Sequence, residues 1–289
     1  MSASERTIRR ASAKMVRLPS GRVVPTLGQG TWKMGEDRAM RRTELAALRL
    51  GVELGMTLID TAEMYGDGAA ERLVGEAIAG RRADVFLISK VLPQHATREG
   101  TIEACAHSLQ RLGTNYLDLY LLHWREDVPL EETLAAFESL KRAGMIRDYG
   151  VSNFDRDEME DAIELPGGDE IVTDQVLYNL KHRGIEWDLE PWCREHGLPI
   201  MAYSPVDHGS LTQHAELSAI ARRHNATPAE ISLAWVLQHD DIIAIPKAAK
   251  PSHVRQNRAA LDLTLTPEDL EELDEIFPPP PAKIPLATK

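Results

Sequence analysis

Short apolar runs alternate with longer segments of helical periodicity along most of the chain. Runs of this kind, bounded by turn-forming residues, are typical of buried strands. Eight of them are predicted strands: Thr26–Gly30, Thr57–Asp60, Val85–Lys90, Leu117–His123, Arg147–Ser152, Ile171–Gln175, Pro199–Tyr203 and Ile242–Pro246. Because a helical segment follows each strand, the pattern predicts repeated βα units and a parallel sheet.

The segments between the runs carry their apolar residues at helical spacing. Leu45, Leu48 and Val52, for example, fall on one face of the first of them. Four such segments are predicted helices: Thr43–Leu54, Thr101–Leu112, Leu130–Ala143 and Ala229–Gln238. Thr227 favours a helix start because a proline follows it directly and an acidic residue lies three positions further on.

Eight βα units predict a single α/β domain with the (β/α)₈ TIM-barrel fold. Met15–Leu18 and Arg22–Pro25 flank a Pro-Ser-Gly turn and predict a β-hairpin that caps one end of the barrel, and two extra helices are expected. The main alternative, a doubly wound sheet, usually has a Gly-x-Gly-x-x-Gly turn after its first strand. Gly28–Trp32 does not complete that motif.

The two ends of the chain have a different character from the rest. Residues 1–14 are polar and mixed in charge, which predicts a flexible segment. Residues 15–277 form the predicted barrel. Residues 278–289 begin with four consecutive prolines and predict an extended, solvated tail.

The composition narrows the range of partners and of cellular locations. A net charge of −12 makes nucleic acid an unlikely partner, because the protein as a whole repels phosphates. Cys105 and Cys193 show no metal-ligand spacing, and two isolated thiols suit a reducing cytoplasm. No apolar run is long enough to span a membrane, and the start of the chain lacks a signal-peptide core. We expect a cytoplasmic protein, most simply a monomer.

Polar residues, three of them titratable, stand at the ends of four predicted strands. Asp60, Lys90, His123 and Gln175 occupy these positions, and Tyr65 follows in the loop after Asp60. In a TIM barrel the C-terminal strand ends form one rim, where catalysis takes place. Each residue alone has an ordinary structural interpretation, as a cap, a solvated lysine or a packed ring. Together they predict a rim site.

The chemistry of this set is coherent. A phenol has a pKa of about 10, and a nearby ammonium group lowers it. A carboxylate holds the ammonium in place, and an imidazole orients a substrate oxygen. Such a set can protonate an alkoxide as hydride reaches its carbon. The sequence shows neither an activated Ser or Cys nucleophile nor a cluster of metal ligands.

Seven short motifs, in order, resemble those of the aldo-keto reductase family over about Val16–Leu273. They are Gly55–Gly66, Ile88–Lys90, Asp118–Trp124, Gly150–Phe154, Gln175–Asn179, Ala202–Pro205 and Ile245–Lys247. Tyr178–Glu186, with the short C-terminal segment, is most similar to bacterial aldehyde and methylglyoxal reductases. The resemblance implies NAD(P)H-dependent reduction of small aldehydes and ketones such as methylglyoxal.

The resemblance also implies a role for each site residue. Tyr65 would be the general acid, Lys90 its pKa-lowering partner, Asp60 the anchor of that lysine, and His123 the group that orients the carbonyl. The remaining residues would bind the cofactor or the substrate. The nicotinamide carboxamide would be bound by Ser152, Asn153 and Gln175, and the ring would stack on Tyr203. The loop over the pyrophosphate would begin with Ser204 and Pro205, the ribose would lie near Gly30, Thr31 and Trp32, and the cofactor would also contact Lys247, His253 and Asn257. The walls of the substrate pocket would be Trp32 and Trp124.

The sequence departs from the family pattern where the adenosine 2′-phosphate would bind. Ala248 stands where NADPH-preferring members often have serine, and His253 stands where they often have arginine. Both changes weaken phosphate binding, although Lys247 is retained. Nearby donors could substitute for them: Lys250, Ser252 and Arg255. NADPH is the expected cofactor, and NADH is possible.

Two other functions fit parts of the pattern. Asp60 and Glu63 could be the paired carboxylates of a hydrolase, but Lys90 and the carboxamide-binding residues would then have no role. A non-catalytic, nicotinamide-binding regulatory barrel would have the same fold. An intact set of four catalytic residues argues against this second alternative.

Overall fold

The computed structural model describes residues 14–289, apart from the side chains at positions 212 and 213. The predicted flexible segment 1–14 therefore lies outside the described residues except for Lys14. The Lys14 ammonium donates to the carbonyl oxygens of Leu237 at 3.0 Å and Gln238 at 3.1 Å, at the end of α8 (Pro228–Leu237). A cation at this point satisfies helix-end carbonyls that have no partner within the helix.

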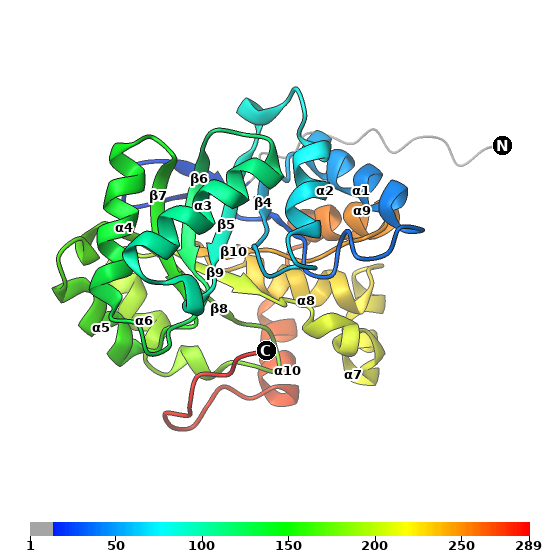
Figure 1. Ribbon diagram of the computed structural model, residues 1–289. Helices are drawn as coiled ribbons and strands as arrows, with labels where there is room; N and C mark the ends of the chain where they lie inside the picture. The colour runs from blue at the N-terminus through cyan, green and yellow to red at the C-terminus, as the bar shows by residue number, and fades with distance from the viewer. Residues whose placement is uncertain (1–13) are drawn as a thin grey trace.

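Eight parallel strands form the barrel, in the order β3 to β10 around the sheet (Figure 1). Their bounds are Gln29–Gly30 (β3), Leu58–Asp60 (β4), Phe86–Val91 (β5), Leu117–Leu122 (β6), Ile146–Ser152 (β7), Ile171–Leu177 (β8), Ile200–Tyr203 (β9) and Ile242–Ala244 (β10). The barrel closes between its first and last strands, where Gly28 N donates to Ala244 O at 2.8 Å. All eight predicted strands are confirmed, but the first is regular only over β3.

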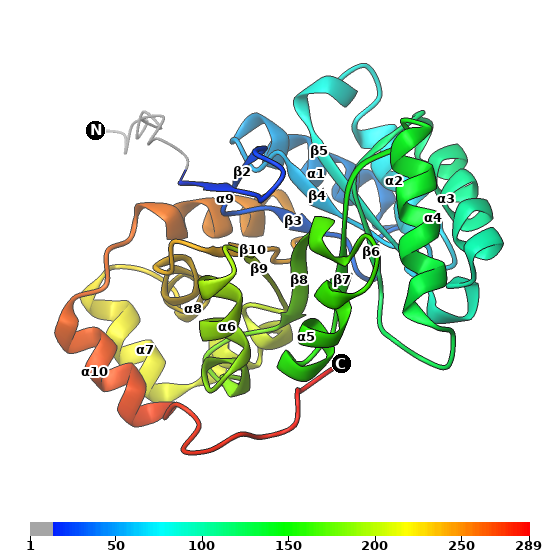
Figure 2. The same cartoon turned by 90° about the vertical axis from the view of Figure 1, so that its left-hand side faces the viewer.

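Helices surround the strands (Figures 1 and 2). Besides α8 they are α1 (Arg41–Glu53), α2 (Ala69–Ala77), α3 (Arg98–Leu112), α4 (Leu130–Arg142), α5 (Arg156–Glu164), α6 (Leu189–Glu195), α7 (Ala215–Arg223), α9 (Pro251–Ala259) and α10 (Pro267–Ile276). Helices α7 and α10 are the two additions to the eight-helix ring and lie side by side in Figure 2. The predicted start of α8 is confirmed, because Thr227 and Glu230 form a capping box. Among residues 14–289 no helix is long and apolar enough to cross a membrane.

The strands bury both faces, so the core has two parts. Alternate residues such as Leu58, Ile88 and Leu119 fill the inside of the barrel, while Leu87 and Val91 point outward into the larger core beneath the helices. This alternation decides which side chains at the strand ends face the mouth of the barrel.

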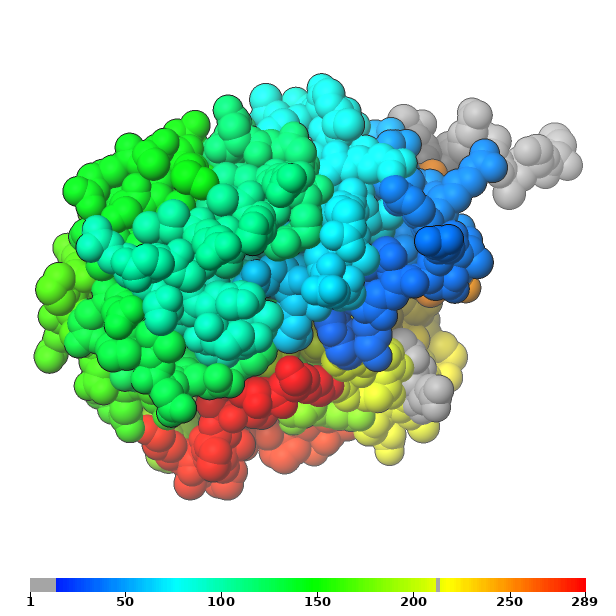
Figure 3. Space-filling model, in the orientation of Figure 1, coloured from blue at the N-terminus to red at the C-terminus, as the bar shows by residue number. Residues whose placement is uncertain are grey.

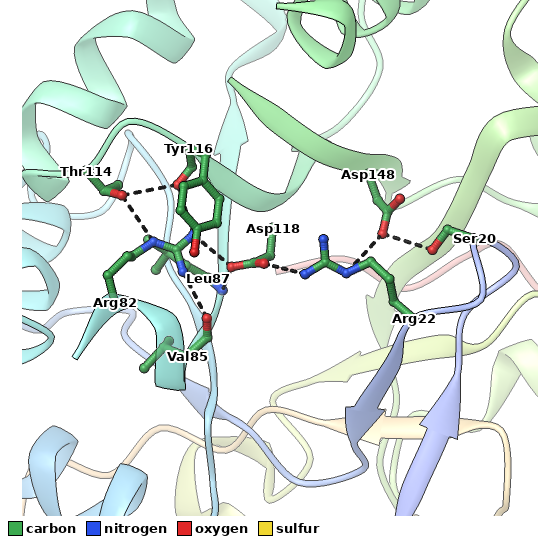
Figure 4. A network of polar contacts seen from close by, with 9 residues as sticks. All are labelled: Ser20, Arg22, Arg82, Val85, Leu87, Thr114, Tyr116, Asp118 and Asp148. Carbon is green, nitrogen blue, oxygen red and sulfur yellow. Dashed lines mark hydrogen bonds and ion pairs between the residues drawn. The ribbon is translucent and has the colours of Figure 1, made fainter. Parts of the chain in front are cut away.

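The predicted hairpin covers the N-terminal end of the barrel. It pairs β1 (Met15–Arg17) with β2 (Val23–Pro25). Arg22 reaches from it to the carboxylates of Asp118 and Asp148, and Ser20 donates to Asp148 at 3.0 Å (Figure 4). Asp118 also accepts from Arg82 at 2.7 Å.

The proline-rich tail is extended and none of its residues is buried, as predicted, but its lysines form ion pairs with the barrel. Lys283 pairs with Asp157 at 3.1 Å and with Asp188 at 3.2 Å, and Lys289 pairs with Asp207 in the segment that follows β9. The acidic surface supplies partners for the lysines of the tail, and so the end of the tail lies against the barrel (Figure 3).

Candidate active site

The structure brings the predicted strand-end residues together at the C-terminal rim. Asp60 ends β4, Lys90 lies near the end of β5, His123 directly follows β6, and Gln175 lies in β8. Tyr65, in the loop after β4, completes the group. All four strand-end side chains are buried, and three of them, Asp60, Lys90 and Gln175, are joined by hydrogen bonds.

The Lys90 ammonium is at the centre of the cluster and is completely buried. It donates to Asp60 Oδ2 at 2.8 Å, to the Thr61 carbonyl at 3.0 Å and to the Tyr65 hydroxyl at 3.1 Å. Burial lowers the pKa of Lys90, but the adjacent Asp60 and Tyr65 raise it more, so the net pKa is raised. The ammonium therefore keeps its charge next to the phenol.

The pKa of Tyr65 depends on burial as well as on Lys90. Burial raises this pKa and is the largest influence, while Lys90 lowers it and Asp60 raises it. Lys90 acts in the predicted direction, but the net pKa is raised because burial outweighs the ammonium. The phenol is consequently protonated at neutral pH, as a proton donor must be.

His123 lies across the site from Tyr65. The ring centroids are 5.8 Å apart and the planes are inclined at 76°. Burial, followed by the charge of Lys90, lowers the pKa of His123 to about 2. Its Nδ1 atom is buried and has no hydrogen-bond partner among residues 14–289. The imidazole is therefore neutral at physiological pH and can orient an oxygen without changing the charge of the site.

The residues predicted to bind a carboxamide form one hydrogen-bonded set beside His123. Asn153 donates to the His123 carbonyl at 3.0 Å and accepts from the Tyr203 hydroxyl at 2.9 Å. Gln175 donates to Asp60 Oδ1 at 2.9 Å, which links this set to the Lys90 cluster.

The backbone conformation of Asn153 is also uncommon for a residue other than glycine. Its φ is +62°, a left-handed conformation that asparagine tolerates better than most residues. Ser152 and Asn153 do not cap the next helix, because Asp155 caps α5. Amide donors and acceptors at the mouth, with the half-buried Tyr203 ring beside them, fit a nicotinamide carboxamide.

The two predicted pocket tryptophans lie in different surroundings. Trp124 packs edge-on against His123, with ring centroids 4.8 Å apart, and its indole donates to Glu126 at 3.0 Å. Trp32 is 38% exposed and packs at the same centroid distance against His208. The sequence offered no sign of His208, which lies in the irregular segment after β9 and is brought to Trp32 only by the fold.

The remaining predicted cofactor residues surround the same end of the barrel. Thr31 is buried and donates to the Asp60 carbonyl at 2.9 Å. Gly30 forms a bridge with Lys247, which places this lysine beside the loop after β3. Exposed His253 and buried Asn257 both lie on α9. The Ser204 hydroxyl contacts His208, and Pro205 is buried. A lysine close to the start of a helix fits a phosphate group.

The hydrolase alternative finds little support in this geometry. Both oxygens of Asp60 are occupied, by Lys90 and by Gln175. Glu63 accepts from the Leu92 backbone at 2.8 Å and contacts His95 at 3.0 Å. Across the described part of the chain no group of three or more His, Cys, Asp or Glu side chains could hold a metal ion.

Comparison with known proteins assigns the chain to a family. The model of the aldo/keto reductase family matches residues 26–277, and the chain belongs to this family. It is 50% identical over 278 residues to the methylglyoxal reductase YeaE of Escherichia coli, a match that covers 94% of this chain and 98% of the relative.

Solved structures show the same fold. An aldo/keto reductase from Klebsiella pneumoniae in complex with NADP and acetate has 49% identity and a TM-score of 0.93, covering 96% of this chain and 99% of that one. A second Klebsiella pneumoniae aldo-keto reductase structure, in complex with NADPH, has 48% identity and a TM-score of 0.94 and covers 96% and 100%. The predicted family and the (β/α)₈ fold are therefore confirmed.

Proposed function

We propose that this protein uses NADPH to reduce small aldehydes and ketones, with methylglyoxal-like compounds as its substrate class. The observation that carries the proposal is the buried chain of contacts from Asp60 through Lys90 to the Tyr65 hydroxyl. The relatives named methylglyoxal reductases and the neighbours bound to NADP or NADPH support the choice of substrate and of cofactor.

The cofactor would lie between the residues at the mouth of the barrel. Asn153 and Gln175 would hold the carboxamide, the Tyr203 ring would lie against the nicotinamide, and Lys247 would face the 2′-phosphate. When bound, the reduced nicotinamide supplies a hydride to the carbonyl carbon. NADH would bind in the same way without the contact to Lys247.

Tyr65 would supply the proton that completes the reduction. Its hydroxyl gives a proton to the carbonyl oxygen as the carbon gains hydride, and the product is an alcohol. The resulting phenolate stays next to the Lys90 ammonium, which stabilises the negative charge until solvent returns a proton. Neutral His123 orients the carbonyl oxygen towards the Tyr65 hydroxyl.

The test is a panel of carbonyl compounds offered with NADPH and with NADH. We expect oxidation of NADPH, followed by its absorbance, with methylglyoxal and other small aldehydes and more slowly with ketones. A control without carbonyl compound should show no change. Hydrolysis of a glycoside without any nucleotide change would support the hydrolase alternative instead.

The regulatory alternative gives a different result in the same experiment. A regulatory barrel binds NADPH, seen as a change in its fluorescence, yet oxidises none with any carbonyl compound. Binding without turnover across the panel would therefore contradict the proposed function while leaving the cofactor assignment intact.

A further inference from the structure

The loop that carries Tyr65 leads into α2 without a side-chain cap at the start of the helix. Gly66, Asp67 and Gly68 all have left-handed backbone conformations, with φ of +56°, +52° and +74°. Gly68 is the N-cap residue of α2, and no side chain caps this helix. A side-chain cap normally satisfies one of the free N–H groups there. Backbone hydrogen bonds close the loop locally, with Ala69 N donating to Gly66 O at 3.0 Å and Ala70 N to Tyr65 O at 3.2 Å, and contacts from elsewhere in the fold add to them.

Glu71, in the first turn of α2, supplies such contacts. Its side chain is completely buried. One carboxylate oxygen accepts from the Ser89 hydroxyl at 2.6 Å, and the other is paired with Arg111 of α3. A fully buried carboxylate persists only when it is paired and hydrogen-bonded. Glu71 therefore fixes α2 to both β5 and α3.

Arg111 holds the other side of the same junction. A Cβ atom at Gly68 would lie 2.4 Å from Cδ and 2.6 Å from Nε of Arg111. The arginine stem thus packs directly on the glycine, at a position where its positive φ also favours glycine. One arginine contacts both the loop that follows Tyr65 and the carboxylate of Glu71.

Residues on both faces of strand β5 consequently hold the Tyr65 loop and the start of α2. Ile88 belongs to the core inside the barrel, and Leu87 and Val91 belong to the core outside it. Lys90 therefore points inward, to the Tyr65 hydroxyl, and its neighbour Ser89 points outward, to α2. The inner and outer contacts come from adjacent residues of one strand.

We infer that Glu71, held by Ser89 and Arg111, is a positioning residue that sets the distance between the Tyr65 hydroxyl and the Lys90 ammonium. The inference rests on the proposed function, because it concerns the proton donor of that reaction. Glu71 itself touches neither substrate nor cofactor and acts through the loop and the start of α2.

The test replaces Glu71 by glutamine, which keeps the shape and removes the charge that faces Arg111. A displaced phenol should lower kcat about 10- to 100-fold, because small misplacements are costly in catalysis. NADPH affinity should stay within about twofold, since the cofactor residues lie on other strands. The matched control is Glu76→Gln on the same helix, which removes an exposed pair with Arg41 and should leave turnover unchanged.

The pH profile separates positioning from a general loss of stability. Lys90 lowers the pKa of Tyr65, and its influence weakens with distance. In Glu71→Gln the profile for alcohol oxidation, which needs the phenolate, should therefore move to higher pH. The double variant Glu71→Gln/Arg111→Gln leaves no unpaired, half-buried cation against α2, so it should regain thermal stability and keep the shifted profile.

Each outcome has a distinct meaning. If Glu71→Gln does not fold, Ser89→Ala removes one contact without stranding Arg111, and a smaller shift of the profile in the same direction is expected. An unmoved profile in whichever variant folds overturns the inference, even if kcat falls. Wild-type protein that turns over no carbonyl compound contradicts the proposed function, and the inference falls with it. Normal wild-type turnover with an unmoved profile overturns the inference alone.

Discussion

Asp60 at one end of the barrel and Asp118 at the other are both buried carboxylates that contact cationic side chains. Asp118 accepts hydrogen bonds from Arg22, from Arg82 at 2.7 Å and from the Leu87 backbone at 2.9 Å. Arg82 in turn also donates to the carbonyls of Val85 and Tyr116, each at 2.9 Å (Figure 4). Every charged side chain in this N-terminal cluster therefore has a hydrogen-bond or ion-pair partner.

The C-terminal cluster differs because some of its hydrogen-bonding groups have no partner. Lys90 is fully engaged, but its contact with the Tyr65 hydroxyl leaves the phenol proton to be donated elsewhere. His123 is neutral and its Nδ1 has no partner within residues 14–289. The N-terminal network is saturated and joins the hairpin to the barrel, whereas the C-terminal cluster keeps a phenol proton and an imidazole nitrogen without partners among the described residues.

The largest effect is expected for Tyr65→Phe. The variant keeps the ring and removes the only proposed proton donor, so kcat should fall by about 10²–10⁴-fold. NADPH affinity, measured by titration, should be nearly unchanged. The control is Tyr116→Phe at the N-terminal end, where the ring packs against Arg82 and turnover should be normal. Full activity in Tyr65→Phe would remove this tyrosine from the mechanism.

The corresponding change at the N-terminal end should affect stability instead. Asp118→Ala leaves Arg82 without its carboxylate partner and Arg22 with Asp148 alone, at a cost of about 3–5 kcal/mol in the free energy of unfolding. A loss at the lower end of this range is expected because the Arg22 side chain is 34% exposed and can be hydrated. Urea denaturation measures the loss, and Asp84→Ala, at an exposed pair, is the control. A fall in kcat per folded molecule would contradict the separation of the two ends.

The sequence predicts the frame of the protein better than the contacts within it. Alternation of apolar runs located all eight strands, since burial on both faces produces continuous apolar segments. Asp60, Lys90 and His123 could be placed at one rim because the topology brings all C-terminal strand ends together. The roles assigned to them remain predictions.

The contacts that hold distant segments together could not be predicted. Arg22 and Asp118 are 96 positions apart, and neither has a local pattern that names its partner. The tail was expected to be solvated because of its prolines, and the pairing of Lys289 with Asp207 depends on where the fold places the loop after β9. The raised pKa of Tyr65 likewise depends on burial, which its loop position does not reveal.

The acid stability of the protein should depend on His123. Its pKa is about 2 in the folded protein and about 6.5 in the unfolded chain, so below pH 6.5 the unfolded chain binds the extra proton. Stability should therefore fall as pH drops from about 6.5 towards 2, by up to about 1.4 kcal/mol per pH unit for one proton. His123→Gln cannot bind that proton.

Thermal unfolding between pH 4 and 8 tests this expectation. The variant should lose less stability than the wild type on the acid side, and the two should run parallel above pH 7. His107→Gln, at an exposed position of α3, should keep the wild-type slope. Equal acid slopes for wild type and His123→Gln would show that His123 takes up a proton in the folded protein.

The smallest effect is expected where the 2′-phosphate of NADPH would bind. His253 lies exposed there, in the first turn of α9. An arginine there offers a permanent charge and a planar fork that matches a phosphate. His253→Arg should tighten NADPH binding by at most about tenfold, or about 1.4 kcal/mol. NADH has no phosphate at this point, so its affinity should not change. Gln110→Arg, an exposed position of α3, controls for added charge alone.

Lys247→Ala sharpens the same test, because Lys247 is the cation that the Gly30 bridge holds beside the loop after β3. Its loss should narrow the difference in Kd between NADPH and NADH, while His253→Arg should widen it. A wild type that strongly prefers NADPH and does not respond to His253→Arg would show that Lys247 and the start of α9 are sufficient for the phosphate. The bound 2′-phosphate would then resemble the Asp118 carboxylate, whose hydrogen-bond acceptors are already paired, so that an added cation would find no free acceptor.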